Sequence, residues 1–315
     1  MKNYLAGGVN SPIPIPTHYP NDIISGNGPY VVDKNGDKYI DLWMGYGALL
    51  FGHSDSEIMD TINNTVKNGW FFSYQTYIEK ELSKLIHDII PSAERIRFAT
   101  TGSDAVAYSI RASRVYSSRK KVLSIIGGYH GVHEGMIPSA GTLNNSCLDL
   151  IPFNDVEAVK EKLKNKEYAC FLLEPILANS GCTPPQENYL KKIREICNDT
   201  STVLIFDEIV TGFRVGLQGA QGFYGVIPDL SLFSKAIAGG LPLSVIYGKR
   251  KIMENFLPNG DVFFAGTFNV NPLSLSVSKI IINKLKNSNL YLKNEELGND
   301  LRQYITEQIN NFRLP

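Results

Sequence analysis

Short apolar runs that alternate with helical patterns are the feature that most restricts how this chain can fold. Runs with strand character cover residues 95–100, 121–126 and 168–173, and two more end at Phe206 and Phe233. A helical pattern over residues 105–116 separates the first two runs. Strands that alternate with helices form parallel sheets with right-handed crossovers. The sequence therefore predicts an α/β fold, in which helices cover both faces of a doubly wound, mostly parallel central sheet.

Turn residues and polar side chains come directly after these strands. They include Thr101-Gly-Ser, Gly127-Gly-Tyr-His-Gly and Glu174-Pro175. The carboxyl ends of parallel strands meet at one rim, and open α/β sheets bind their ligands at that rim. We therefore expect the functional site at the carboxyl ends of the strands.

Lys235 and Asp207 are the strongest candidates for chemistry on this rim. Asp207 ends a β-branched, apolar run that begins at Thr202, and Lys235 follows the apolar run that ends at Phe233. Taken singly, a lysine after a strand is usually a solvated loop residue, and a carboxylate behind apolar residues only needs a partner. Together they are the pair that pyridoxal phosphate requires, an amine for the Schiff base and an anion for the pyridinium nitrogen. The spacing predicts a pyridoxal phosphate site.

A phosphate site is predicted at Thr101-Gly102-Ser103, which opens a helix. The N-terminus of a helix favours an anion, and a glycine lets the backbone approach it closely. The same residues are equally consistent with a plain capping turn. The chain has no GxGxxG, GxxxxGK[ST] or GxSxG motif, so a dinucleotide dehydrogenase, a P-loop enzyme and an α/β-hydrolase lose their main support.

Composition excludes several classes of partner. The 315 residues are 43% hydrophobic and 20% charged, with zero formal net charge, so we expect no nucleic-acid partner. There is no apolar run near the length of a membrane span and no signal-peptide pattern, so we expect no membrane partner. The four cysteines show no metal-binding or disulfide spacing, and His130 and His133 lack the spacing of a zinc-binding helix. We therefore expect a cytoplasmic protein without a metal site.

A set of motifs in fixed order connects this chain to a known family. They are Gly7–Pro12, Gly52-His53, Arg97–Ala105, Gly128–Gly131, Glu174-Pro175, Ile205–Glu208, Thr211–Arg214, Gly219–Gln221, Pro228-Asp229, Ser234-Lys235, Gly239–Pro242, Gly266-Thr267 and Asn271-Pro272. With these motifs the chain resembles the class III (subgroup II) pyridoxal-phosphate aminotransferases. It is most similar to the branch that contains glutamate-1-semialdehyde 2,1-aminomutase. The resemblance implies the fold type I, aspartate-aminotransferase-like architecture.

The resemblance also implies a role for each site residue. Lys235 would form the Schiff base and carry the proton between the substrate α-carbon and the cofactor, and Asp207 would hold the ring nitrogen. Tyr129 would stack on one face of the ring, although a core tyrosine is the alternative, and Ile209 would pack on the other. Asn179 would line the site.

Two further roles concern the phosphate and the assembly. Gly102 and Ser103 would hold the phosphate of the chain's own cofactor. Thr267 would reach the phosphate in the neighbouring subunit, which implies a homodimer with shared active sites. The partners implied are a small-molecule amino donor and a carbonyl acceptor.

Departures from the aminomutase pattern bear on the substrate. In the aminomutase an arginine that recognises the substrate carboxylate stands two places after the motif that here ends at Pro12, and this chain has Pro14 there. Proline cannot replace a bidentate guanidinium. The segment between His130 and Pro152 is also short beside the aminomutase's gating loop. These differences favour a plain aminotransferase, with the aminomutase as the alternative.

Domain limits follow from the same alignment of motifs. We expect an N-terminal segment over residues 1–45, a large cofactor-binding domain over 46–285, and the start of an incomplete C-terminal small domain over 286–315. The short C-terminal part leaves a further alternative, a non-catalytic subunit that keeps the fold for binding or assembly.

Overall fold

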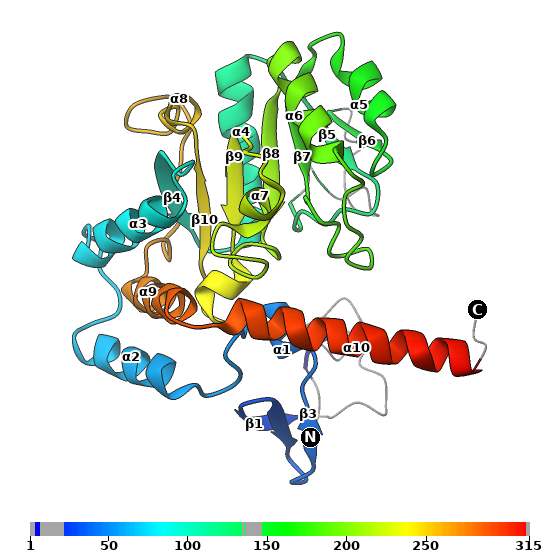
Figure 1. Cartoon of the computed structure of the whole chain (residues 1–315). Helices are drawn as coiled ribbons and strands as arrows, with labels where there is room; N and C mark the ends of the chain where they lie inside the picture. Colours follow the sequence, from blue (N-terminus) through cyan, green and yellow to red (C-terminus); the bar gives the residue numbers. More distant parts are fainter. Residues whose placement is uncertain (1–3, 7–21, 134–135, 137–146, 313–315) are drawn as a thin grey trace.

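The central element is a seven-stranded sheet with the strand order β4-β10-β9-β8-β7-β5-β6 (Figure 1). The computed structural model describes residues 4–6, 22–133, 136 and 147–312. Within them, the strands of this sheet are β4 (Arg95–Ala99), β5 (Lys121–Ile125), β6 (Leu148–Ile151), β7 (Tyr168–Leu173), β8 (Val203–Glu208), β9 (Leu230–Phe233) and β10 (Ser244–Gly248). Neighbours from β6 to β9 are parallel, and β10 runs antiparallel to both β9 and β4. The predicted mostly parallel sheet is confirmed.

Helices cover both faces of the sheet because its inner strands are apolar on both sides. All six residues of β7 and of β8 are buried. In β7, Cys170 and Leu172 pack with α4 (Gly102–Ser117), whereas Phe171 and Leu173 pack with α5 (Val156–Leu163) and α6 (Tyr189–Thr200). Side chains alternate between faces along a strand, so a continuous apolar run needs a cover on each face.

A second layer of helices packs beside β10 and β4. It contains α2 (Ser56–Lys67), α3 (Tyr77–Ile89) and α9 (Pro272–Lys286), and α9 contacts the 3-10 turn η2 (Lys235–Ala238). A separate three-stranded sheet is formed by β1 (Ile23–Asn27), β2 (Tyr30–Asp33) and β3 (Lys38–Ile40). The remaining helices of the described residues are α1 (Met44–Gly47), α7 (Gly219–Tyr224), α8 (Arg250–Met253) and α10 (Leu290–Phe312). Figure 1 shows α10 running past α1 toward the C-terminus, and none of its residues is buried.

The two largest differences between predicted and observed boundaries each have a physical reason. The strand expected to end at Phe206 continues to Glu208, because Asp207 and Glu208 still pair with Leu232 and Phe233 of β9, so Asp207 lies inside β8. The helix expected from Ala105 begins at Gly102, because Thr101 caps it. The division into segments 1–45, 46–285 and 286–315 stays a prediction. No helix formed by the described residues has both the length and the apolar character to cross a lipid bilayer.

Candidate active site

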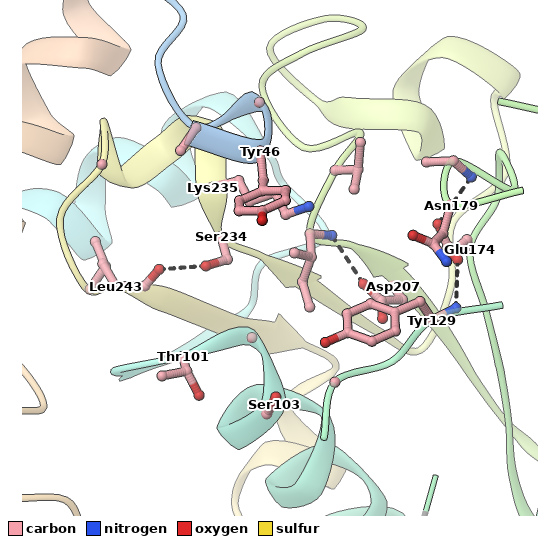
Figure 2. Close-up of a pocket in the computed structure, with 18 of the residues that line it drawn as sticks. Tyr46, Thr101, Ser103, Tyr129, Glu174, Asn179, Asp207, Ser234, Lys235 and Leu243 are labelled. Atoms are coloured by element: carbon pink, nitrogen blue, oxygen red, sulfur yellow. Dashed lines mark hydrogen bonds between the residues drawn. The ribbon is translucent and has the colours of Figure 1, made fainter. Parts of the chain in front are cut away.

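A cavity of about 620 Å³ opens at the carboxyl ends of the strands, where the sequence predicts the site. Its walls bring together seven of the eight predicted site residues, namely Gly102, Ser103, Tyr129, Asn179, Asp207, Ile209 and Lys235. Figure 2 shows Tyr129, Asp207 and Lys235 around this space. Thr267 is exposed and lies outside the wall of the cavity.

Lys235 occupies the first position of η2, directly after β9. Its backbone has a φ of +41°, which is uncommon for a lysine. The Ser234 hydroxyl donates a hydrogen bond to the Leu243 carbonyl at 2.7 Å and fixes the preceding residue. Burial lowers the pKa of the Lys235 amine, and the negative charges of Asp207 and Glu174 oppose that change. The site therefore holds a partly desolvated amine.

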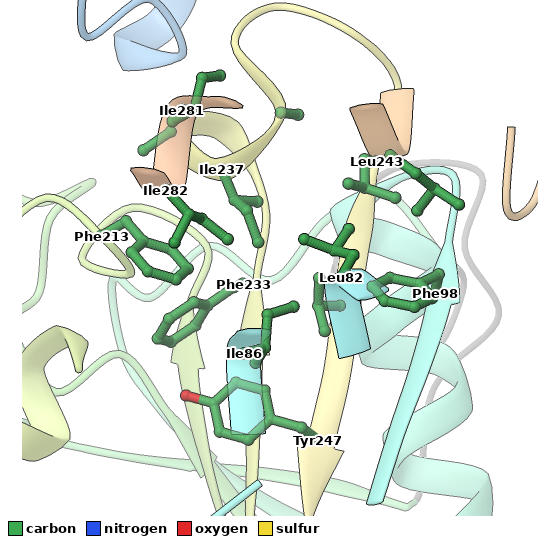
Figure 3. Close-up of a cluster of buried hydrophobic side chains, with 14 of the residues drawn as sticks. Leu82, Ile86, Phe98, Phe213, Phe233, Ile237, Leu243, Tyr247, Ile281 and Ile282 are labelled. Carbon is green, nitrogen blue, oxygen red and sulfur yellow. The ribbon is translucent and has the colours of Figure 1, made fainter. Parts of the chain in front are cut away.

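Packing beneath the lysine fixes its position (Figure 3). Ile237 lies two residues after Lys235 and is completely buried in a cluster with Ile281 and Ile282 of α9. Phe233, two residues before the lysine, packs edge-to-face on Phe213 with ring centroids 5.3 Å apart. Because Phe233 and Ile237 on either side are held in the core, the backbone of Lys235 is fixed beside the cavity.

Asp207 is buried at the bottom of the site. One of its oxygens, Oδ1, accepts a hydrogen bond from the Ile209 N–H at 3.1 Å, and Oδ2 lies 2.7 Å from Nδ1 of the buried His130. If Nδ1 carries the proton, His130 donates a hydrogen bond to the Asp207 carboxylate. This bond fixes the orientation of the carboxylate oxygens. The His130 Nε2 atom has no partner among the described residues.

Glu174 is a second buried carboxylate at the site. Its oxygens accept hydrogen bonds from the backbone N–H of Tyr129 at 2.9 Å and of Ala178 at 3.0 Å. Burial raises the pKa of the Glu174 carboxyl, and the charge of Asp207 adds to that change. Glu174 thus joins the segment that presents Tyr129 to the segment that presents Asn179, as Figure 2 shows.

The start of α4 supplies a cradle for an anion. Thr101 and Asp104 satisfy each other's backbone N–H groups in a capping box, at 3.0 and 3.2 Å. The N–H groups of Gly102 and Ser103 are left without an acceptor in the described part of the chain. A Cβ at Gly102 would lie 2.6 Å from the Ile209 Cδ1, so any other residue here would require the Ile209 side chain to move.

Another part of the cavity wall is the strained turn at residues 44–47, which contributes Tyr46 and Gly47 to the lining. Met44, Gly45, Tyr46 and Gly47 all have positive φ values, between 45° and 83°. A left-handed conformation costs about 1–2 kcal/mol at each residue that is not glycine. The Asp41 carboxylate stabilises the turn by accepting hydrogen bonds from the N–H groups of residues 43 and 44, at 2.8 and 3.0 Å. Such strain is typical of functional sites.

These groups fit pyridoxal phosphate. The cavity presents an amine, a buried carboxylate, an aromatic ring and a helix start with free N–H groups, which match the aldehyde, ring nitrogen, ring face and phosphate of that cofactor. Sequence reasoning missed His130 and Glu174 as site residues. Their only signal was position, because each follows a strand on the same rim as Asp207.

Comparison with known proteins decides the family. The family model for class III aminotransferases matches residues 16–312. The chain belongs to the class III aminotransferases. It is therefore a pyridoxal-phosphate-dependent aminotransferase, and the resemblance inferred from its motifs is confirmed.

Relatives and solved structures agree with this assignment. Over 301 residues the chain is 39% identical to a glutamate-1-semialdehyde 2,1-aminomutase of Saccharolobus islandicus strain L.S.2.15, covering 90% of this chain and 71% of the relative. A transaminase structure with pyridoxal phosphate bound superposes with a TM-score of 0.93 at 27% identity, covering 99% of this chain and 77% of the other. A glutamate-1-semialdehyde aminomutase structure from Pseudomonas aeruginosa PAO1 gives a TM-score of 0.86 at 25% identity, covering 93% and 70%. The fold type I architecture is confirmed.

Proposed function

We propose that this class III aminotransferase moves an amino group from a small-molecule donor to a separate aldehyde or ketone acceptor, with Lys235 as the reactive amine. The observation that carries the proposal is the desolvated Lys235 amine in one cavity with the buried Asp207. Bound pyridoxal phosphate supplies an electron sink for the bonds at the substrate carbon that carries nitrogen.

Lys235 provides the nucleophile and the proton carrier of this site. A lowered pKa leaves a larger fraction of the amine neutral near neutral pH, and only the neutral form attacks a carbonyl carbon. Once displaced by the donor's nitrogen, the same Nζ atom can accept and return the proton at the substrate carbon. The fixed backbone of η2 keeps that atom on one side of the cavity.

Asp207 keeps the ring nitrogen protonated. A buried carboxylate is stable when it is paired, and a pyridinium would supply the opposite charge. His130 positions the Oδ2 atom at 2.7 Å, and the Ile209 N–H positions Oδ1 at 3.1 Å. We assign His130 as a positioning residue because it acts through Asp207.

The remaining predicted residues bind and orient the cofactor. The free N–H groups of Gly102 and Ser103 hold the phosphate at the start of α4. Tyr129, Ile209 and Asn179 all line the cavity, where Tyr129 would stack on one face of the ring, Ile209 would pack on the other, and Asn179 would contact the ring substituents. Tyr129 is half exposed, which fits a stacking platform better than a core tyrosine.

A homodimer with shared sites completes the proposal. Thr267 is exposed and precedes Phe268, which is also exposed. The Phe268 ring lies 5.8 Å from the exposed ring of Phe71, and the two form an exposed aromatic patch. An apolar patch of this kind marks an interface, and a second copy seated there would carry Thr267 to the neighbouring phosphate. A cytoplasmic location stays a prediction.

An aminomutase is the second candidate, favoured by the names of relatives at 39% identity. An aminomutase must bind a small carboxylate in one orientation and retain an intermediate diamine between two half-reactions. The arginine expected for the first task is Pro14 here, and the segment expected for the second is short. Pro14 and residues 137–146 lie outside the described residues. The sequence differences favour transfer to a separate acceptor.

Turnover with defined substrates separates the two candidates. The cofactor-loaded chain is given glutamate 1-semialdehyde, and 5-aminolevulinate is quantified beside the Saccharolobus islandicus enzyme as the reference. In parallel, a panel of amino donors is tested with keto acids and aldehydes as acceptors. We expect slow isomerisation and faster transfer to a separate acceptor. Isomerisation at the rate of the reference enzyme, without transfer, would establish the aminomutase instead.

A further inference from the structure

The Gly52-His53 motif lies outside the cavity wall and has no part in the chemistry proposed above. Gly52 has a φ of +82°, and a Cβ on it would lie 2.9 Å from the Gly28 carbonyl oxygen, so only glycine allows this approach of two backbone segments. Gly28 and His53 exchange two backbone hydrogen bonds, each of 2.9 Å. The motif therefore fixes the backbone that carries the His53 side chain.

The His53 side chain reaches the Asp41 carboxylate. Its Nε2 atom lies 2.7 Å from Asp41 Oδ2. Burial favours the neutral form of Asp41, but the hydrogen bonds from His53 and from the N–H groups of residues 44 and 43 outweigh it and lower the pKa of the Asp41 carboxyl. An ionised carboxylate only accepts hydrogen bonds, so His53 Nε2 carries the proton and donates it to this contact.

Asp41 connects His53 to the strained turn at residues 44–47. Its Oδ1 atom accepts the N–H groups of residues 43 and 44, and Oδ2 is left for His53. At the other end of the turn, the Arg214 guanidinium donates a hydrogen bond to the Gly47 carbonyl. Positive φ values at Met44 and Tyr46 are unfavourable for residues with side chains, so the shape of the turn depends on these contacts.

The turn places two aromatic rings at the active site. Trp43 and Tyr46 both line the cavity, and their rings meet edge-to-face with centroids 5.4 Å apart. Figure 2 shows Tyr46 in the same cavity as Lys235, and α1 also contacts η2, which begins at Lys235. A donor whose nitrogen reacts at Lys235 would therefore meet this part of the wall.

We propose that His53 is a positioning residue of the active site, which fixes the Asp41 carboxylate and thereby holds Trp43 and Tyr46 where they contact the amino donor. The inference rests on the proposed function, because the donor is the molecule that reacts at Lys235. A side chain outside the cavity wall then sets the affinity for the donor. The structural alternative is that His53 only joins the loop at residues 52–54 to the hairpin of β1 and β2.

Variants that differ by one hydrogen-bond donor test the proposal. His53→Gln keeps an N–H donor on a side chain of similar reach, whereas His53→Phe and His53→Leu remove the donor. Ser54→Ala is the matched control, because the Ser54 hydroxyl donates to the Gly26 carbonyl at 2.8 Å and joins the same loop to the hairpin without involving Asp41. Stopped-flow absorbance follows the first half-reaction of each cofactor-loaded chain with 1-phenylethylamine and with alanine. Retained far-ultraviolet circular dichroism and cofactor absorbance show that the variants fold.

We expect His53→Phe and His53→Leu to raise the donor concentration for half-maximal rate by about ten-fold, because a hydrogen bond to a charged group is lost. The limiting rate should stay within about three-fold, since Lys235 and Asp207 are unchanged. His53→Gln should restore most of the affinity, and Ser54→Ala should leave it unchanged. An equal loss in Ser54→Ala, no loss without the donor, a loss in the limiting rate alone, or no rescue by His53→Gln would overturn the proposal.

A fluorescence measurement does not depend on turnover. The chain has two tryptophans, Trp43 and Trp70, so Trp70→Phe leaves Trp43 as the only one. The proposal expects the anisotropy of Trp43 emission to fall when His53→Phe or His53→Leu is added, because a released turn moves faster, and to recover with His53→Gln. Unchanged anisotropy in every variant would refute the hold on the turn. If neither donor reacts with the wild type, the proposed function fails, and the anisotropy still decides the role of His53.

Discussion

At the scale of single residues, the proposed chemistry depends on a buried carboxylate with a fixed orientation. Replacing Asp207 by Asn keeps the shape of the site and removes the charge that would hold the ring nitrogen protonated. We expect the variant to retain the cofactor and to lose amino-transfer rate by a factor of about 10² or more. Stopped-flow absorbance of the first half-reaction measures this. Asp88→Asn, at an exposed ion pair on α3, is the control, and an equally active Asp207→Asn variant would rule out the role.

The Lys235 amine should show its environment in a pH profile. Because its pKa is lowered, the neutral amine appears at lower pH, so covalent attachment of pyridoxal phosphate to the apo chain should reach half its maximal rate below the ordinary lysine pKa of about 10.4. Removing the neighbouring positive charge in Arg214→Gln should move that midpoint up. Removing the negative charge in Asp207→Asn should move it down. A midpoint that stays fixed in both variants would contradict the described electrostatics.

At the scale of elements, one buried residue connects β8 to α7. The Glu208 carboxylate accepts hydrogen bonds from the Thr211 hydroxyl at 2.9 Å, from the Gln221 N–H at 3.2 Å, and from the Ala220 N–H. Replacing Glu208 by Ala leaves these buried donors unpaired and should lower the free energy of unfolding by about 3 kcal/mol. Urea denaturation measures the loss. A change below about 0.5 kcal/mol, as at an ordinary surface position, would contradict this description.

The same residue predicts how stability depends on pH. Burial raises the pKa of Glu208 from 4.5 to about 7 in the folded chain, so the folded state binds the proton more tightly than the unfolded state. The contribution of this group to stability is therefore full below about pH 4.5 and declines as the pH rises toward 7. The Glu208→Gln variant should lack this decline, so the free energy of unfolding of the wild type minus that of the variant should fall as the pH rises from 4.5 toward 7. A difference curve that is flat over that range would show that Glu208 titrates normally.

The elements also show which features a single sequence can predict. The fully apolar run of β7 was predicted with correct limits, because a strand buried on both faces has a distinct pattern. The strand β10 and its antiparallel direction were not predicted. Spacing after buried strands identified Asp207 and Lys235. It could not identify the contact of His130 with Asp207 or that of Arg214 with Gly47, because these residues are 77 and 167 positions apart in the chain and meet only through tertiary packing.

At the scale of the whole molecule, shared active sites predict complementation. A Lys235→Ala chain mixed with a Thr267→Ala chain should form hybrid dimers in which one of the two sites carries neither change. We expect each parent dimer to be weak or inactive and the mixture to regain activity after refolding together. Native mass spectrometry of differently tagged chains verifies hybrid formation. Hybrids without any recovered activity would show that Thr267 does not serve a neighbouring site.

The central claim is that Lys235 is the amine that bonds to pyridoxal phosphate. Reducing the cofactor-loaded chain with borohydride makes the bond permanent, and peptide mass spectrometry then locates the added mass. The account predicts bleaching of the yellow colour and a single modified residue, Lys235, with no covalent cofactor in a folded Lys235→Ala variant. A label on another lysine, or covalent cofactor that persists in Lys235→Ala, would contradict it.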